Sequence, residues 1–192
     1  VDVPVASLSV AEKQLVEIAK ALSQEASIII MDEPTAALTS DQVEFLFGVI
    51  RTLKSRGVSV IYISHDLKRV LEICDRVSVL RNGRNVSVVD AGAVSVDDLA
   101  CDITGEVSIP ATRREPRDSI SATQKSCTDD SILEVETVVA PRVHGVSFAL
   151  RPNEIMGIAG LSGSGRTELL ELMFGVTQPL QGRILVNGAP LT

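Results

Sequence analysis

The 192-residue sequence has no tryptophan, and only 3% of its residues are aromatic. Proteins that bind single-stranded nucleic acids stack the bases on aromatic side chains, so this scarcity argues against such a ligand. The net charge of −7 points the same way. Lysine and arginine are scattered through the sequence, whereas a phosphate backbone requires a concentrated basic surface. We therefore expect no nucleic-acid partner.

Cysteines and long apolar runs are also scarce. Cys74, Cys101 and Cys127 are odd in number and far apart, which fits neither a disulfide framework nor a metal-binding spacing and suits a reducing compartment. The apolar runs are short, such as residues 28–31, and a bilayer span needs roughly 18. No basic start followed by an apolar stretch marks a secretion signal. These absences predict a soluble, cytoplasmic protein that reaches a membrane only through a partner.

Apolar residues make up 45% of the sequence, and their spacing up to about residue 104 predicts helices that alternate with buried strands. Continuous apolar strands are typical of a parallel sheet that is covered on both faces. A strand, a helix and a second strand in succession predict a right-handed parallel crossover. Asn82-Gly83 predicts the turn of a hairpin. The expected elements are helices at 10–23, 40–56, 67–74 and 95–104 and strands at 27–31 and 58–64.

Residues 105–131 are polar, contain two prolines and show no periodicity, so we interpret them as a linker. Residues 132–192 resume the pattern of strands and helices. This second segment stops without returning strands, and the first opens at a helix, so we interpret both as incomplete domains. The expected class is α/β, with a parallel sheet, flanking helices and an antiparallel β portion. The expected elements of the second segment are strands at 132–138, 143–150, 154–159 and 184–188 and a helix at 166–174.

A glycine-rich loop, Gly160-Leu-Ser-Gly-Ser-Gly-Arg-Thr167, stands between an expected strand and an expected helix. The spacing is that of the phosphate-binding P-loop, whose glycines let backbone N–H groups converge on phosphate oxygens at a helix N-terminus. Arg166 stands where the motif has lysine. It keeps the charge, but its planar fork is bulkier than an ammonium group, so we expect less efficient hydrolysis here. The residues expected to bind phosphates are Gly160, Ser162, Gly163, Ser164, Gly165, Arg166 and Thr167, with the Thr167 hydroxyl also placed to ligate Mg²⁺.

Ionisable side chains follow two of the expected buried strands. Asp32 and Glu33 end the first strand, and His65 ends the second. The carboxyl ends of parallel strands meet at the ligand-binding edge of a sheet. There, Asp32 could hold Mg²⁺ through water, Glu33 could polarise an attacking water and His65 could contact a γ-phosphate. Each has an ordinary alternative as a solvated turn residue, and the three together favour a nucleotide site.

Ser9 precedes the first helix, and with Glu12 it forms a capping-box pattern. Capping is a sufficient explanation for that pair. In addition, the exposed N–H groups and the Ser9 hydroxyl could face a phosphate offered by another domain.

Three stretches in this order, LSVAEKQLVEIAKAL, IIIMDEPTAALT and VIYISHDL, resemble the signature helix, the Walker B motif with its D-loop and the switch histidine of ATP-binding-cassette ATPases. The resemblance continues through VSFALRPNEIMGIAGLSGSGRTELLELMFG, which looks like the opening of a second cassette. Its arginine-containing loop is typical of monosaccharide importers. Residues 1–104 would then be the C-terminal half of a first nucleotide-binding domain, and residues 132–192 the N-terminal part of a second.

The resemblance implies ATP and Mg²⁺ as cofactors. It implies that Asp32 serves the metal, that Glu33 is the catalytic base and that His65 is the switch residue. Cassettes of this family assemble head to tail, so the Arg166 loop would face the Ser9 signature. The resemblance also implies that Glu33 and His65 serve a different site, whose phosphate loop lies outside this chain. We therefore expect background hydrolysis from the isolated chain.

The function implied by the resemblance is ATP hydrolysis coupled to monosaccharide uptake through a separate permease, fed by a periplasmic sugar-binding protein. The protein would lie peripherally on the cytoplasmic face of the inner membrane. Two alternatives stay open, namely a soluble tandem-cassette ATPase and a nucleotide-binding regulatory module without turnover. The first segment lacks a phosphate-loop strand of its own, and the second carries one. We therefore also consider that the two segments dock like one circularly permuted cassette, which would bring Gly165 near Asp32.

Overall fold

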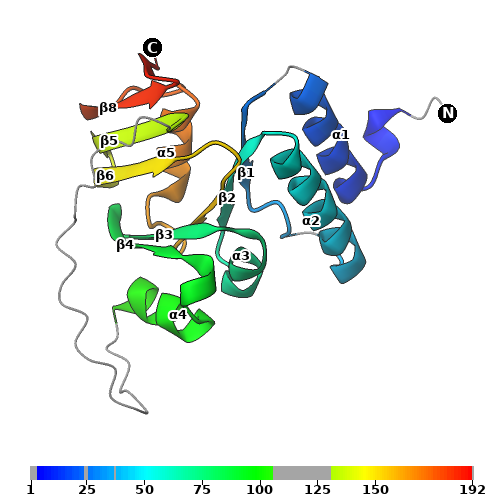
Figure 1. Cartoon of the computed structure of the whole chain (residues 1–192), viewed down its shortest axis with the longest axis horizontal. Coiled ribbons are helices and arrows are strands. Elements are labelled where there is room, and N and C mark those ends of the chain that lie inside the picture. The colour runs from blue at the N-terminus through cyan, green and yellow to red at the C-terminus, as the bar shows by residue number, and fades with distance from the viewer. Residues whose placement is uncertain (1–3, 24–25, 37, 106–130, 192) are drawn as a thin grey trace.

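The computed structural model describes residues 4–23, 26–36, 38–105 and 131–191. These residues form a five-stranded sheet in the order β1-β2-β7-β3-β4 and a four-stranded sheet in the order β6-β5-β8-β9 (Figure 1). The first sheet is parallel except for the β3–β4 hairpin, and the second is antiparallel. The α/β class predicted from the sequence is thereby confirmed. The predicted linker lies almost entirely outside the described residues.

The first segment follows the predicted order of elements closely. Thr39 and Gln42 have the spacing of a capping box in the sequence, and in the structure the Thr39 backbone N–H donates to the Gln42 side chain at 3.0 Å at the start of α2. Gly57 closes the same helix with a φ of +93°. Short 3₁₀ turns cover Val5–Ser7 and Ala91–Ala93. The remaining elements are α1 (Val10–Ser23), β1 (Ile28–Asp32), α2 (Ser40–Ser55), β2 (Ser59–Ser64), α3 (Leu67–Ile73), β3 (Arg76–Arg81), β4 (Arg84–Asp90) and α4 (Val96–Thr104).

The second segment also matches its predicted elements, with differences of a few residues at their ends. One short strand, β9, was not predicted, because two residues carry no periodicity. The elements are β5 (Leu133–Ala140), β6 (Val143–Leu150), β7 (Ile155–Ala159), α5 (Arg166–Met173), β8 (Gln181–Val186) and β9 (Ala189–Pro190).

The position of β7 joins the two segments. This strand belongs to the second segment, yet it lies between β2 and β3 of the first and is parallel to both. All five of its residues are buried, as expected for a central strand covered on both faces. The docking of the two segments into one sheet, considered above from the sequence, is thereby confirmed.

Each face of the five-stranded sheet carries its own hydrophobic core. One face packs against α2, α3 and α4, with Phe47, Tyr62 and Leu99 among its fully buried side chains. The other face packs against α5 and the second sheet, with Ile61, Met156 and Leu169 among its buried members. Figure 1 shows α2 and α5 on different sides of the strands. The phosphate-loop helix is therefore held between two sheets.

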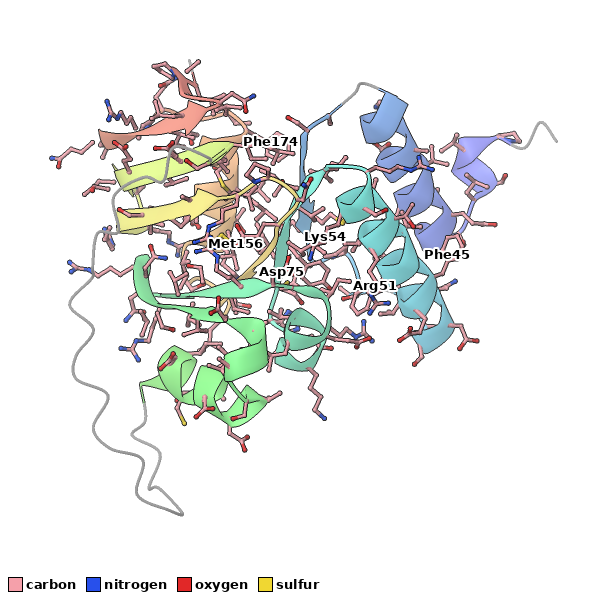
Figure 2. The ribbon with its side chains drawn as sticks, viewed as in Figure 1. Phe45, Arg51, Lys54, Asp75, Met156 and Phe174 are labelled. Atoms are coloured by element: carbon pink, nitrogen blue, oxygen red, sulfur yellow. The ribbon has the colours of Figure 1, made fainter. Side chains whose placement is uncertain are left out.

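Polar contacts at the start of β7 connect the segments further. The Glu154 carboxylate, 7% exposed, accepts two hydrogen bonds from the Arg76 guanidinium and one from the Arg151 N–H, and Arg76 Nη2 also donates to the Ala149 carbonyl at 2.6 Å. The Asp75 N–H donates to the Ile155 carbonyl at 2.8 Å, and the Asp75 carboxylate accepts from the Ile155 N–H at 2.8 Å. Figure 2 shows Asp75 beside Lys54 of α2, and their charged atoms lie 2.5 Å apart. These bonds fix the register of β7.

The helices within the described ranges are all too short or too polar to cross a bilayer.

Candidate functional site

The ends of β1 and β2 bring the predicted ionisable residues together. The two strands pair in parallel, with Asp32 opposite Ile63, so the residues that follow them share one edge of the sheet. Glu33 has a φ of +45°, and its N–H donates to the Ile63 carbonyl at 2.9 Å. A residue other than glycine with this φ is uncommon, and such strain is typical of functional sites. The turn aims the Glu33 carboxylate at His65, whose Nδ1 lies 2.8 Å away.

Four donors converge on the Glu33 carboxylate. The Ser64 hydroxyl donates to Oε2 at 3.2 Å, and the His65 N–H donates to Oε1 at 3.2 Å. The His65 ring and Arg166 Nη1, at 2.8 and 2.9 Å, also contact Oε1. The Arg166 side chain is only 11% exposed, so its charge is poorly screened. The phosphate-loop arginine of the second segment thus contacts the acidic residue of the first directly.

The two neighbouring carboxyl groups are shifted in opposite directions. Partial desolvation and repulsion by Glu33 raise the pKa of Asp32, although Arg166 opposes the shift. Desolvation also acts to raise the pKa of Glu33. The hydrogen bonds from His65 and Arg166 outweigh it, and the pKa of Glu33 falls below its ordinary value. Glu33 is therefore ionised at neutral pH. A cation placed beside Asp32 would stabilise the charged form of that carboxyl group.

The glycine-rich loop follows β7 and wraps around the start of α5. Gly163 and Gly165 have φ values of +79° and +94°, which side chains rarely tolerate. A Cβ built on Gly160 would lie 2.5 Å from the Leu80 carbonyl oxygen. The close approach of the loop to β3 therefore requires a residue without a side chain at this position. A Cβ on Gly163 would meet no atom within 4 Å, so the space beside that backbone is open.

The helix α5 begins directly after this loop. Gly165 is its N-cap, and no side chain of the described residues caps the helix. The first N–H groups of the helix can therefore donate to a ligand, and the helix dipole favours an anion there. Thr167 is exposed in the first turn. The Ser164 hydroxyl is buried without a hydrogen-bond partner in the structure. These features fit a triphosphate, because the loop offers an uncapped helix start, open backbone and a buried cation.

Two turns support the loop from the side away from Glu33. The Gly83 N–H of the β3–β4 turn donates to the Ser164 carbonyl at 2.9 Å, and the Gly83 carbonyl accepts from the His144 N–H at 2.6 Å. The carbonyl oxygen of Arg142, in the β5–β6 turn, would lie 2.5 Å from a Cβ built on Gly165. Sequence reasoning identified Asn82-Gly83 only as a hairpin turn, because its contact with the loop depends on the strand order.

The structure does not bring Ser9 to this group of residues. The Ser9 N–H and hydroxyl both donate to the Glu12 carboxylate at 2.8 Å, as the capping pattern predicts. Figure 1 shows α1 and α5 at different sides of the sheet. In contrast, Glu33 and His65 lie beside the chain's own phosphate loop, whereas the resemblance implied a loop outside this chain. The difference arises because β7 occupies the vacant position between β2 and β3.

A strand, a glycine-rich loop and a helix beside two acidic residues and a histidine form the arrangement that is typical of the P-loop class of nucleotide-binding proteins. The family profile described as ABC transporter matches residues 1–36 and 143–192, which contain Ser9, Asp32 and Glu33 and the whole loop. The chain belongs to the ATP-binding-cassette family, and membership of this family implies ATP binding.

The chain is similar to import proteins of several bacteria. It is 45% identical over 186 residues to a Burkholderia cenocepacia (strain HI2424) protein whose name describes ribose/galactose/methyl galactoside import, covering 96% of this chain and 35% of that protein. It is 43% identical over 188 residues to the ribose import ATP-binding protein RbsA of Clostridium perfringens, covering 97% and 36% respectively. The galactose/methyl galactoside import ATP-binding protein MglA of Fusobacterium nucleatum is 40% identical over 187 residues, covering 96% and 36%. The chain thus spans about a third of the length of the curated relatives it matches.

Proposed function

We propose that the chain is part of the ATP-hydrolysing subunit of an ABC-type monosaccharide importer. The observation that carries the proposal is the contact between Arg166 of the phosphate loop and Glu33 at the end of β1, 2.9 Å apart. The names of the relatives describe import of ribose, galactose and methyl galactoside. They support a monosaccharide as the transported substrate. A separate permease and a periplasmic sugar-binding protein are the partners, and the chain associates peripherally with the cytoplasmic face of the inner membrane.

The residues of the phosphate loop hold the β- and γ-phosphates of ATP in this proposal. The backbone N–H groups from Gly160 to Gly165 and the start of α5 bind the phosphate oxygens, and Arg166 supplies a positive charge. When it binds phosphate oxygens, the Arg166 guanidinium gives up part of its contact with the Glu33 carboxylate. Arginine binds both groups well because its planar fork matches carboxylate and phosphate alike.

Mg²⁺ is the metal in this proposal, with Asp32 and Thr167 as the protein ligands. The described residues contain no group of three or more His, Cys, Asp or Glu side chains that could hold a metal. This suits Mg²⁺, which keeps several waters and is bound through one or two protein ligands together with substrate phosphates. The ion compensates the charge of Asp32, whose pKa is raised by desolvation and by Glu33.

Glu33 is the general base and His65 the switch residue at the γ-phosphate. Glu33 is ionised and already lies in the turn that aims it at His65, so it can accept a proton from an attacking water. Ser9 lies at the start of α1 and serves the site of a neighbouring cassette. Residues 1–104 are the C-terminal half of a first nucleotide-binding domain, and 132–192 the N-terminal part of a second. The linker at 105–131 allows the two halves to share a sheet.

Calorimetric titration of the 192-residue chain with Mg²⁺ and ATP tests the site. We expect saturable binding that Arg166→Ala weakens at least tenfold, because loss of the buried cation removes a charge-assisted bond to phosphate. Arg51→Ala is the matched control, since Arg51 pairs with Glu72 at 3.8 Å on the surface of α2 and α3 (Figure 2). Equal loss of affinity in both variants would contradict the proposed site.

Turnover is a separate measurement. We expect the isolated chain to hydrolyse ATP at background, because its own Ser9 signature does not face its phosphate loop. Robust turnover that Glu33→Gln abolishes would refute that expectation. Fractionation of cells separates the remaining alternatives: recovery with membranes that contain the permease supports the importer, and recovery with ribosomes or RNA supports the soluble tandem-cassette ATPase. Binding by the full-length protein without any turnover supports the regulatory module.

A further inference from the structure

The turn that follows β1 determines where the Glu33 carboxylate points. Glu33 has a φ of +45°, and the chain then turns back so that the Ala36 N–H donates to the Glu33 carbonyl at 3.2 Å. A residue other than glycine keeps such a strained conformation only where the surrounding structure over-determines it. The bond from the Glu33 N–H to the Ile63 carbonyl fixes only the start of the turn. Further contacts along the turn are therefore needed to hold the strained conformation.

Two side chains from neighbouring elements hold Thr35, the third residue of this turn. Thr35 is only 4% exposed, and its hydroxyl lies 3.1 Å from the hydroxyl of Tyr62 on β2. The Thr35 carbonyl accepts a hydrogen bond from Arg69 Nη1 on α3 at 3.2 Å. Pro34, between Glu33 and Thr35, restricts the backbone further because its ring fixes φ. The turn is thus attached both to the strand and to the helix that follow it in the chain.

Arg69 also reaches Glu33 by a second route. Its Nε lies 3.1 Å from the Asp66 carboxylate, and the Asp66 N–H donates to the Ser64 hydroxyl at 3.1 Å. The Ser64 hydroxyl in turn donates to Glu33 Oε2 at 3.2 Å. Together with the bond to the Thr35 carbonyl, these contacts form a closed ring that joins the turns after β1 and β2. A planar guanidinium suits this position, because its donors point in fixed directions and bind two acceptors at once.

Capping of α3 accounts for only part of this arrangement. Asp66 is the N-cap of the helix and accepts from the Arg69 N–H at 3.3 Å, a contact that any residue except proline would provide at position 69. The ion pair between the two side chains is partly exposed, and exposed ion pairs contribute little stability. The bond to the Thr35 carbonyl crosses from α3 to a different turn, which helix capping does not require. The Arg69 side chain therefore does more than stabilise the start of its own helix.

We infer that Arg69 is a positioning residue, which holds the turn after β1 so that the Glu33 carboxylate stays directed at the phosphate loop. Its own contacts are with Thr35 and with the N-cap of α3, so it acts on Glu33 through other residues. This inference rests on the proposed function, in which Glu33 is the general base, and adds the residue that keeps that base in its orientation.

Two groups outside α3 report the direction of the Glu33 carboxylate. The His65 N–H donates to Glu33 Oε1 at 3.2 Å, and Arg166 Nη1 lies 2.9 Å from the same oxygen. Hydrogen exchange of the His65 amide is measured by NMR in the nucleotide-free 192-residue chain. The NMR signals of the Arg166 guanidinium are recorded on the same sample, because the ion pair with Glu33 slows the rotation of that group.

The variant Arg69→Met keeps the apolar stem of the side chain and removes the guanidinium. We expect the His65 amide to exchange about tenfold faster in this variant, the factor that corresponds to one lost hydrogen bond to a charged group. The Arg166 signals should change to those of a freely rotating guanidinium. The Val70 N–H donates to the Asp66 carbonyl within α3, and its exchange should stay within about twofold of that in the unmodified chain. A role limited to the start of α3 would instead accelerate the exchange of both amides alike.

Lys68→Met is the matched control, because Lys68 is an exposed cation at the start of the same helix. We expect none of the three signals to change in it. Glu33→Ala removes the carboxylate itself, so the Arg166 signals of that variant should already be those of a freely rotating guanidinium. Adding Arg69→Met to Glu33→Ala should change them no further, because Arg69 acts through Glu33.

Three outcomes would overturn the inference. These are unchanged exchange of the His65 amide in Arg69→Met, equal acceleration of the His65 and Val70 amides, and the same effect in Lys68→Met. The measurements are made without nucleotide, so any of these results would leave the proposed ATP site standing. Failure of the chain to bind ATP in the calorimetric titration would instead refute the proposed function, and with it the role of Glu33 as the base that Arg69 positions.

Discussion

At the scale of single residues, Glu33 shows how a local backbone conformation is maintained by a charge network. A φ of +45° is unfavourable for glutamate, yet it places the carboxylate where Ser64, His65 and Arg166 all donate to it. Hydrogen bonds to a charged group contribute a net stabilisation of about 1.5–3 kcal/mol each. The net gain outweighs the strain and keeps Glu33 ionised. Among the described residues, no comparable set of donors reaches its neighbour Asp32, and desolvation and repulsion by Glu33 raise the pKa of Asp32.

This contrast predicts opposite effects of two neutralising substitutions. The folded-state pKa of Glu33 lies below its unfolded value, so its stabilising contribution is present above about pH 4.5 and is lost as the pH falls through the folded pKa. We expect Glu33→Gln to lower the free energy of unfolding at pH 7 by about 1–2 kcal/mol and to match the unmodified chain more closely at pH 3.5. Asp32 has a raised pKa, so its charge opposes folding at neutral pH. Asp32→Asn should therefore stabilise slightly at pH 7.

Urea unfolding of the three proteins at pH 3.5 and pH 7 measures both effects. The prediction is wrong if Glu33→Gln and Asp32→Asn change the free energy of unfolding in the same direction at pH 7.

At the scale of elements, the loop between β7 and α5 depends on glycine for two separate reasons. Gly163 and Gly165 both have positive φ values, but their surroundings differ. A Cβ on Gly163 would enter open space, whereas one on Gly165 would lie 2.5 Å from the Arg142 carbonyl oxygen and 3.2 Å from Gly83 Cα. Both of these neighbours are backbone atoms and cannot rotate away. The loop is therefore open toward a ligand at Gly163 and closed against the two supporting turns at Gly165.

Alanine substitution separates the two reasons. We expect Gly163→Ala to lower the free energy of unfolding by about 1 kcal/mol, because alanine is less stable than glycine at a positive φ. Gly165→Ala adds a clash with backbone, and we expect a loss of roughly 3 kcal/mol or more in the free energy of unfolding. Denaturant titration followed by circular dichroism measures both. Equal losses would mean that the two turns do not contact the loop as described.

At the scale of the whole molecule, one sheet is assembled from segments far apart in the sequence. β7 reaches its place between β2 and β3 only after the chain has passed through α4 and the linker. The buried pair of Arg76 and Glu154 lies at this junction, with side chains 18% and 7% exposed. A buried ion pair contributes little net stability compared with an apolar pair, but an unpaired buried charge is costly. Our hypothesis is that the pair specifies which strand enters the sheet.

Breaking this pair should test whether the two segments fold as one unit. We expect Glu154→Ala to lower the free energy of unfolding by about 3–5 kcal/mol, because Arg76 is left buried without its partner. The double variant Arg76→Met with Glu154→Met should recover most of that loss. Thermal unfolding in all three proteins should show one transition. Separate transitions for the two segments, or a silent Glu154→Ala, would contradict a shared sheet.

The sequence by itself determined the order of the elements and the residue types of the candidate site. The order of helices and strands, the capping at Thr39, the turn at Asn82-Gly83 and the phosphate loop all follow from local periodicity and from residue types with fixed backbone preferences. Asp32, Glu33 and His65 could be predicted to share an edge because one short crossover connects their strands. Only the tertiary structure decided that β7 completes the first segment's sheet, that Arg166 contacts Glu33 and that Arg142 stands beside the loop. Each of these contacts joins residues separated by a turn or a linker whose path local patterns do not specify. They depend on which strand best fills a buried, doubly covered position.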